Sequence, residues 1–98
     1  MWVGSIQFDL LLGDIHSLKE KRSVVRPIVS ELRRKYDVSA AEAGHLDLHR
    51  RALVGVAVVG AESHHCVDVL DACERLVANR PEVELLSAHR QLRTDEDE

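Results

Sequence analysis

The residues best suited to chemistry are lysines and arginines that follow a helix-start signal. Ser17 lies three residues before Glu20, which is the spacing of a capping box at the start of a helix. Five basic residues come at helical spacing after this signal: Lys19, Lys21, Arg22, Arg26 and Arg33. The free amides and positive dipole end of a helix already favour an anion, and these cations add to that preference. We therefore take the five residues as candidate contacts to the phosphates of structured RNA.

The same charges also fit a simpler role, a solvated helix face on which Glu20 and Asp14 offset them. Lys21 differs from the other four because its position projects near the apolar side of the helix. We expect its aliphatic part to pack over the core while its ammonium reaches solvent. No acid or base is paired with it in the sequence, so a catalytic lysine is not predicted.

Metal binding is a second chemistry to weigh, because the chain has six histidines. Histidine and carboxylate ligands suit zinc or nickel, but neither a cysteine pair nor a His-Glu-x-x-His helix is present to fix the geometry. We interpret these histidines as turn and surface residues, and predict no metal and no cofactor. The histidines and carboxylates that we considered as metal ligands are Glu42, His45, Asp47, His49, His64 and His65.

Nucleophilic catalysis is not predicted either. Cys66 and Cys73 are seven residues apart in a helical pattern, on one apolar face, so we expect two buried free thiols. The five glycines are scattered and form no phosphate-binding loop. We expect a protein that is not an enzyme and has no catalytic residues.

Composition predicts one domain with an aliphatic core. The chain has 98 residues, 45% of them hydrophobic, and only three are aromatic: Trp2, Phe8 and Tyr36. We expect a single domain over residues 1–93, followed by an acidic, disordered tail at 94–98. No signal peptide or membrane-spanning run is visible, so a cytoplasmic location is expected.

The charge distribution is more informative than its total. A net charge of −4 argues against indiscriminate nucleic-acid binding. Residues 18–36 nevertheless hold seven basic and two acidic residues, whereas the rest of the chain holds six basic and fifteen acidic ones. Positive charge is therefore concentrated on the predicted first helix.

Hydrophobic periodicity gives the elements that must position these residues. Alternation predicts strands at 2–12, 37–44, 51–60 and 83–92, and helical spacing predicts helices at 17–36 and 63–79, the second capped by Ser63. Pro27 predicts a kink but not a break, because the apolar face continues across it. The order β-α-β-β-α-β predicts an α+β ferredoxin-like sandwich, with two helices on one face of a four-stranded antiparallel sheet. We expect the first and third strands in the middle.

The open face of this sheet carries no aromatic residue on the first strand, so base stacking there is not predicted. The third strand is apolar on both sides, which fits a central position. It also fits a face covered by a second subunit. We therefore expect a homodimer that forms through this face or through an edge strand, the alternative being a modest exposed apolar patch.

Four segments of the chain form a recognisable set: Trp2-Val3-Gly4, Ser17-Leu18-Lys19-Glu20-Lys21-Arg22, Val38-Ser39-Ala40-Ala41-Glu42 and Arg51-Ala52-Leu53-Val54-Gly55-Val56-Ala57. Together they resemble the YlxP-like family, a group of small bacterial proteins of unknown function, in an actinobacterial version. The resemblance implies a ferredoxin-like fold. It also implies an RNA or ribosome setting, since the family tends to be encoded near translation-initiation and ribosome-maturation factors, but it supplies no activity and no catalytic residues.

Taken together, the sequence predicts a non-enzymatic factor that associates with RNA or the ribosome through the basic face of its first helix. The alternative is a homodimeric protein-interaction module whose basic helix meets an acidic partner surface. Both are electrostatic, so salt dependence alone does not separate them.

Overall fold

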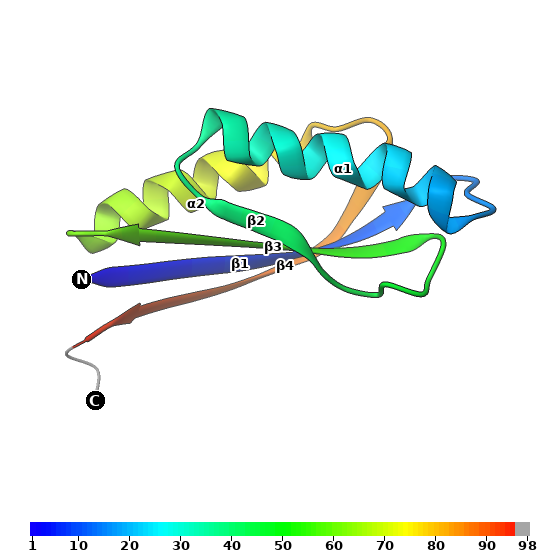
Figure 1. Cartoon of the computed structure of the whole chain (residues 1–98). Coiled ribbons are helices and arrows are strands. Elements are labelled where there is room, and N and C mark those ends of the chain that lie inside the picture. Colours follow the sequence, from blue (N-terminus) through cyan, green and yellow to red (C-terminus); the bar gives the residue numbers. More distant parts are fainter. Residues whose placement is uncertain (96–98) are drawn as a thin grey trace.

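The computed structural model describes residues 1–95 and contains six elements in the predicted order (Figure 1). The strands form one antiparallel sheet in the order β2-β3-β1-β4, and both helices lie on the same face of it. The ferredoxin-like prediction is therefore confirmed, with the first and third strands in the middle. The elements are β1 (Trp2–Leu12), α1 (Leu18–Lys35), β2 (Ser39–Gly44), β3 (Arg51–Gly60), α2 (Ser63–Ala78) and β4 (Val83–Thr94).

The core lies between the sheet and the two helices, and it is built almost entirely from aliphatic side chains. Every second residue of β1 from Ile6 to Leu12 is buried, as alternation predicts for a strand with one covered face. Phe8 is the only aromatic residue among the fully buried side chains of the described chain. The helix residues that meet these strands are Val25, Ile28, Val29, Leu32, Cys66, Leu70, Cys73 and Val77.

The start of α1 has the predicted capping geometry. The Ser17 hydroxyl accepts from the Glu20 amide at 3.1 Å, and the Glu20 carboxylate accepts from the amide of His16 at 3.3 Å. Pro27 lies inside the helix, which continues without interruption to Lys35. One helix thus carries all five candidate residues.

The start of α2 differs from its prediction. Ser63 is the first helical residue and not the cap; Glu62 occupies the cap position with extended backbone, and its side chain makes no capping hydrogen bond. The inner face is as predicted, because Cys66 and Cys73 are both buried free thiols. Burial raises the pKa of the Cys73 thiol to about 11, so it stays protonated and unreactive at neutral pH.

The last strand is longer than the sequence pattern indicated. It continues to Thr94, which pairs with Trp2, so the domain reaches beyond residue 93. Of the predicted acidic tail, residues 96–98 lie outside the described part of the chain. Within residues 1–95, neither helix combines the length and the apolar character that crossing a bilayer requires.

Candidate functional site

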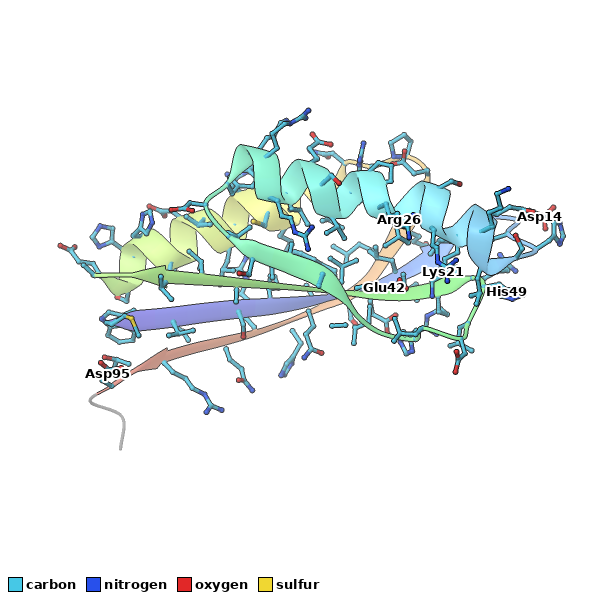
Figure 2. The ribbon with its side chains drawn as sticks, viewed as in Figure 1. Asp14, Lys21, Arg26, Glu42, His49 and Asp95 are labelled. Atoms are coloured by element: carbon cyan, nitrogen blue, oxygen red, sulfur yellow. The ribbon has the colours of Figure 1, made fainter. Side chains whose placement is uncertain are left out.

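Lys21 faces inward, which corrects the expectation that its ammonium reaches solvent. Only 1% of the residue is exposed. Its Nζ lies 2.8 Å from Oε2 of Glu42 on β2 and donates to the carbonyl oxygen of His45 at 2.6 Å (Figure 2). Lys21 is therefore a buried structural cation that joins the first turn of α1 to the end of β2. It is not available to an external anion.

The Lys21 contact continues through the loop between β2 and β3. His45 has a left-handed backbone, with φ of 57°, so its carbonyl meets Lys21 while its ring lies 3.6 Å from the Asp9 carboxylate on β1. Arg51 on β3 binds the same carboxylate through two hydrogen bonds, of 3.1 and 2.6 Å. This chain of contacts fixes the loop against the sheet and leaves the outer face of α1 untouched.

The Asp9–Arg51 pair gives the fold a predictable acid sensitivity. Hydrogen bonding to Arg51 holds the pKa of Asp9 below its ordinary value of 3.8. A depressed carboxylate pKa stabilises the fold at pH values above the unfolded pKa, and that stabilisation is lost as pH falls through the folded pKa.

Asp9→Asn is therefore expected to lower the free energy of unfolding by about 1 kcal/mol at neutral pH, and to flatten its decline in acid. Urea denaturation over a series of pH values measures both effects. The control is Asp47→Asn, since Asp47 is an exposed loop residue with no ion pair among residues 1–95. Equal acid sensitivity in wild type and Asp9→Asn would contradict the prediction.

Three of the five candidate residues do face outward. Lys19, Arg22 and Arg26 are exposed, and none of their charged ends meets an acid in the described part of the chain. Arg22 and Arg26 are one helical turn apart and share a face. Their positive charge is therefore free for an external partner.

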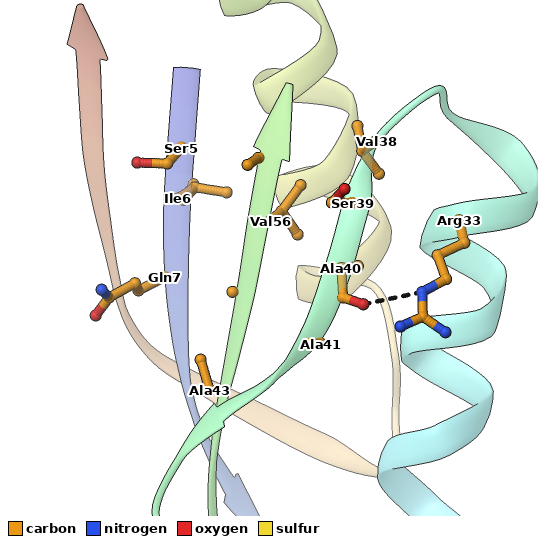
Figure 3. Close-up of a pocket in the computed structure, with 12 residues that line it drawn as sticks. Ser5, Ile6, Gln7, Arg33, Val38, Ser39, Ala40, Ala41, Ala43 and Val56 are labelled. Carbon is orange, nitrogen blue, oxygen red and sulfur yellow. Dashed lines mark hydrogen bonds between the residues drawn. The ribbon is translucent and has the colours of Figure 1, made fainter. Parts of the chain in front are cut away.

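Arg33 is only partly available. Its Nε donates to the carbonyl oxygen of Ala40 at 2.9 Å, on the side of β2 that faces away from β3 (Figure 3). Its side chain also lines a groove of about 390 Å³ between α1 and β2, together with Arg22 and Arg26. Glu42 lines this groove too, but its charge is matched by Lys21. The groove therefore presents a net positive wall.

The first turn of α1 is a poorer anion site than the sequence suggested. The Ser17 hydroxyl already accepts from the Glu20 amide, and the negative Glu20 carboxylate lies at the helix start, where it accepts from the amide of His16. Asp14 adds a second carboxylate beside the helix start, 3.1 Å from the imidazole of His16. The free positive charge thus lies on the outer face of α1, on the surface formed by Lys19, Arg22, Arg26 and Arg33, which we call the α1 basic surface.

The histidines do not come together. His45 turns to Asp9, His64 pairs with Glu62, and Glu42 is held by Lys21. Within residues 1–95, no three histidine, cysteine or acidic side chains converge as metal ligands do. A hollow of about 570 Å³ along β2 and β3 is lined mainly by small neutral residues, and Arg33 is the one charged residue that the described chain contributes to its lining. The α1 basic surface remains the strongest candidate site.

One further cation was not singled out from the sequence. Arg34 is exposed and has no ion pair within residues 1–95, although it lies outside the groove. Its neighbour Arg33 contacts β2 while Lys35 pairs with Glu31 at 3.1 Å. Helical spacing places Arg34 about 100° around the axis from Arg33, which makes it a useful control residue.

Comparisons with known proteins agree on the family and the fold. Uncharacterized protein YlxP of Bacillus subtilis (strain 168) is 29% identical over 82 residues, which are 84% of this chain and 89% of that protein. A de novo designed protein with a ferredoxin fold, solved by NMR in solution, superposes with a TM-score of 0.55 at 12% identity, over 97% of this chain and 88% of its own. The model of the family described as "protein of unknown function (DUF503)" matches residues 3–90. The chain therefore belongs to the DUF503 family.

Proposed function

We propose that this protein is a non-enzymatic factor that binds the phosphates of structured RNA through its α1 basic surface. The observation that supports the proposal is that Lys19, Arg22 and Arg26 are exposed on one helix without acidic partners in the described chain. The protein as a whole is acidic, with a net charge of −4. A local basic surface on an acidic protein favours an anionic partner at that surface and disfavours non-specific binding elsewhere.

The spacing of the arginines suits a phosphate backbone. Arg22 and Arg26 are about 6 Å apart along the helix, and Arg22 and Arg33 about 16 Å, given a rise of 1.5 Å per residue. The groove beside them, between α1 and β2, offers a concave wall against which one strand of an RNA duplex can lie. Guanidinium groups bind phosphate oxygens through paired hydrogen bonds, which is the reason for preferring arginine at such sites.

Recognition of this kind depends on shape and not on base stacking. Phe8 is fully buried, and Trp2 and Tyr36 pack against the core. The outward residues of β1, such as Ser5 and Gln7, cannot stack on bases. Three phosphate contacts give a slope of log K against log salt of roughly −2 to −3. We therefore expect weak binding to any duplex and tighter binding where an RNA surface fits the groove.

The test compares two charge reversals of equal size. Arg22→Glu with Arg26→Glu alters the α1 basic surface, whereas Arg34→Glu with Arg75→Glu alters two exposed arginines outside the groove. Binding to a double-stranded RNA hairpin and co-sedimentation with ribosomes are measured against salt concentration. We expect the first pair to weaken hairpin binding at least about tenfold and to reduce the salt slope by about 2, with the melting temperature unchanged. The second pair is expected to have a much smaller effect.

Crosslinking in cells followed by nuclease treatment decides between RNA and a protein partner. An adduct that nuclease removes supports the proposal. An adduct that resists nuclease and is lost on Arg22→Glu with Arg26→Glu would replace RNA with an acidic protein surface. Equal hairpin binding by both pairs of variants would overturn the role of the α1 basic surface.

A further inference from the structure

The outer edge of β4 is the longest unpaired backbone edge among the described residues. β4 spans twelve residues, and within residues 1–95 it pairs with β1 alone, so no described strand covers its other side. Edge strands of this length offer a row of free amide and carbonyl groups to another strand, and proteins normally cover, blunt or pair them. An edge as long as that of β4 is therefore expected to be covered, blunted or paired.

The opposite edge of the sheet is blunted, and β4 is not blunted in the same way. β2 has only six residues, and the Arg33 guanidinium donates a hydrogen bond to the outward-facing carbonyl oxygen of Ala40 (Figure 3). On β4 the side chain of Arg90 is drawn toward α2, where Asp71 and Glu74 hold it at 2.8 and 3.1 Å. The backbone edge of β4 is left open by these contacts.

Apolar side chains also lie uncovered beside this edge, on the helix side of the sheet. Leu92 pairs with buried Gly4 and so points to the helix side, yet it is 38% exposed. Ala88 points the same way and is exposed as well. Val67 on α2 is 37% exposed. A single copy of the chain therefore does not complete its own core layer along β4.

We propose that a second copy of this chain pairs with β4 in antiparallel fashion, about a two-fold axis at His89. The two sheets then form one continuous sheet, with β4 against β4 of the partner. Apart from the bulged Leu86, each residue from Glu84 to Arg93 faces a defined partner residue across the axis, and the one charged pair joins opposite charges. The facing positions are His89 with His89, Ala88 with Arg90, Ser87 with Gln91, Leu85 with Leu92, and Glu84 with Arg93.

A bulge in β4 makes this register possible. The pairing of β1 with β4 shifts between Asp9 and Leu10, so Leu86 is the extra residue. Without the shift, Glu84 and Arg93 would lie on opposite faces of the sheet, because they are nine residues apart. With the shift, both lie on the open face, opposite Leu11 and Val3 respectively.

The bulge aligns the apolar pair in the same way. Leu85 and Leu92 both lie on the helix side, opposite Leu10 and Gly4 of β1. Facing Leu85–Leu92 pairs would cover part of the exposed apolar surface described above, and facing Glu84–Arg93 pairs would match opposite charges. Arg90 opposes only the small Ala88 and keeps its own acidic partners. The edge is therefore self-complementary on both faces of the sheet.

This inference is independent of RNA binding, because it concerns the opposite edge of the sheet from the α1 basic surface. In the paired sheet all four helices lie on one face, so both α1 basic surfaces point to the same side. An RNA-binding defect with intact dimers, or the reverse, would separate the two proposals.

Sedimentation at a series of protein concentrations tests the dimer through charge exchange. Glu84→Arg and Arg93→Glu are each expected to raise the dimer dissociation constant about tenfold or more, because each creates two like-charge pairs. The double variant restores opposite charges and is expected to return to near the wild-type constant. Circular dichroism checks that each variant is folded.

A disulfide at the axis tests the geometry directly. Residues opposite each other in an antiparallel pair are close enough for a disulfide, so His89→Cys treated with oxidised glutathione is expected to give a covalent dimer. Ser39→Cys, on the blunted β2 edge, is the control and is expected to stay monomeric. A wild type that is monomeric at all concentrations, a double variant that does not recover, or equal crosslinking at Ser39 and His89 would overturn the proposal.

Discussion

Replacing Lys21 with methionine is expected to lower the free energy of unfolding by about 3–5 kcal/mol. The substitution keeps the length of the side chain but removes the ammonium that holds Glu42 and the His45 carbonyl. Oε2 of Glu42 is buried, and within residues 1–95 the ammonium is its one close partner. The variant would leave a partly buried carboxylate, with one oxygen fully buried, without its counter-charge, and it would leave the His45 carbonyl without its donor.

The second variant of the test removes both charges together. Lys21→Met with Glu42→Leu leaves no unpaired ion, so we expect it to recover at least about 2 kcal/mol relative to Lys21→Met alone. Urea denaturation of both variants, with Lys19→Met as the exposed control, measures the difference. If Lys21→Met costs no more than Lys19→Met, the ammonium does not hold the loop as the contacts indicate.

The position of Lys21 shows what the sequence could predict and what it could not. Residues 21, 25, 28 and 32 form one helical stripe, and its other members are the buried Val25, Ile28 and Leu32. This stripe correctly predicted that Lys21 lies on the apolar side of α1. The partner Glu42 lies 21 residues away on another element, and only the packing of α1 on β2 brings them together. A surface lysine and a buried one have the same local sequence pattern until that partner is known.

Arg33 illustrates the same limit on the candidate surface. Its helical position marks it as outward, like Arg22 and Arg26, but β2 passes close enough for its guanidinium to meet Ala40. Lys19, Arg22 and Arg26 were predicted correctly as exposed, and no contact like that of Arg33 ties their charged ends to a strand within residues 1–95. The order of the helices and strands could be predicted from the sequence because alternation and helical spacing are local signals. The last two residues of β4 were missed because Arg93 and Thr94 are polar, and the strand is held there by backbone pairing with β1.

Phe8→Ala is the second large effect, expected to lower the free energy of unfolding by about 3–5 kcal/mol. Phe8 is completely buried on the central strand β1, opposite Val54 of β3 and Ala88 of β4. The core around it is aliphatic, and the rigid strands on either side limit how far it can collapse into the space that a benzyl group leaves. A domain of this size has about 5–15 kcal/mol of stability, so the variant would keep only part of it.

Phe8→Leu is the matched control, because it removes the ring while keeping most of the volume, and it is expected to cost less than about 1.5 kcal/mol. Urea denaturation measures the free energy of unfolding of both variants. Binding of the double-stranded RNA hairpin by Phe8→Leu should equal that of wild type, since Phe8 lies in the core and not on the α1 basic surface. A loss below about 1.5 kcal/mol for Phe8→Ala would mean that β1 shifts to fill the space. The sheet would then be far less rigid than its register implies, and the facing positions proposed for β4 would lose their basis, because they depend on β1 holding the bulge at Leu86 in place.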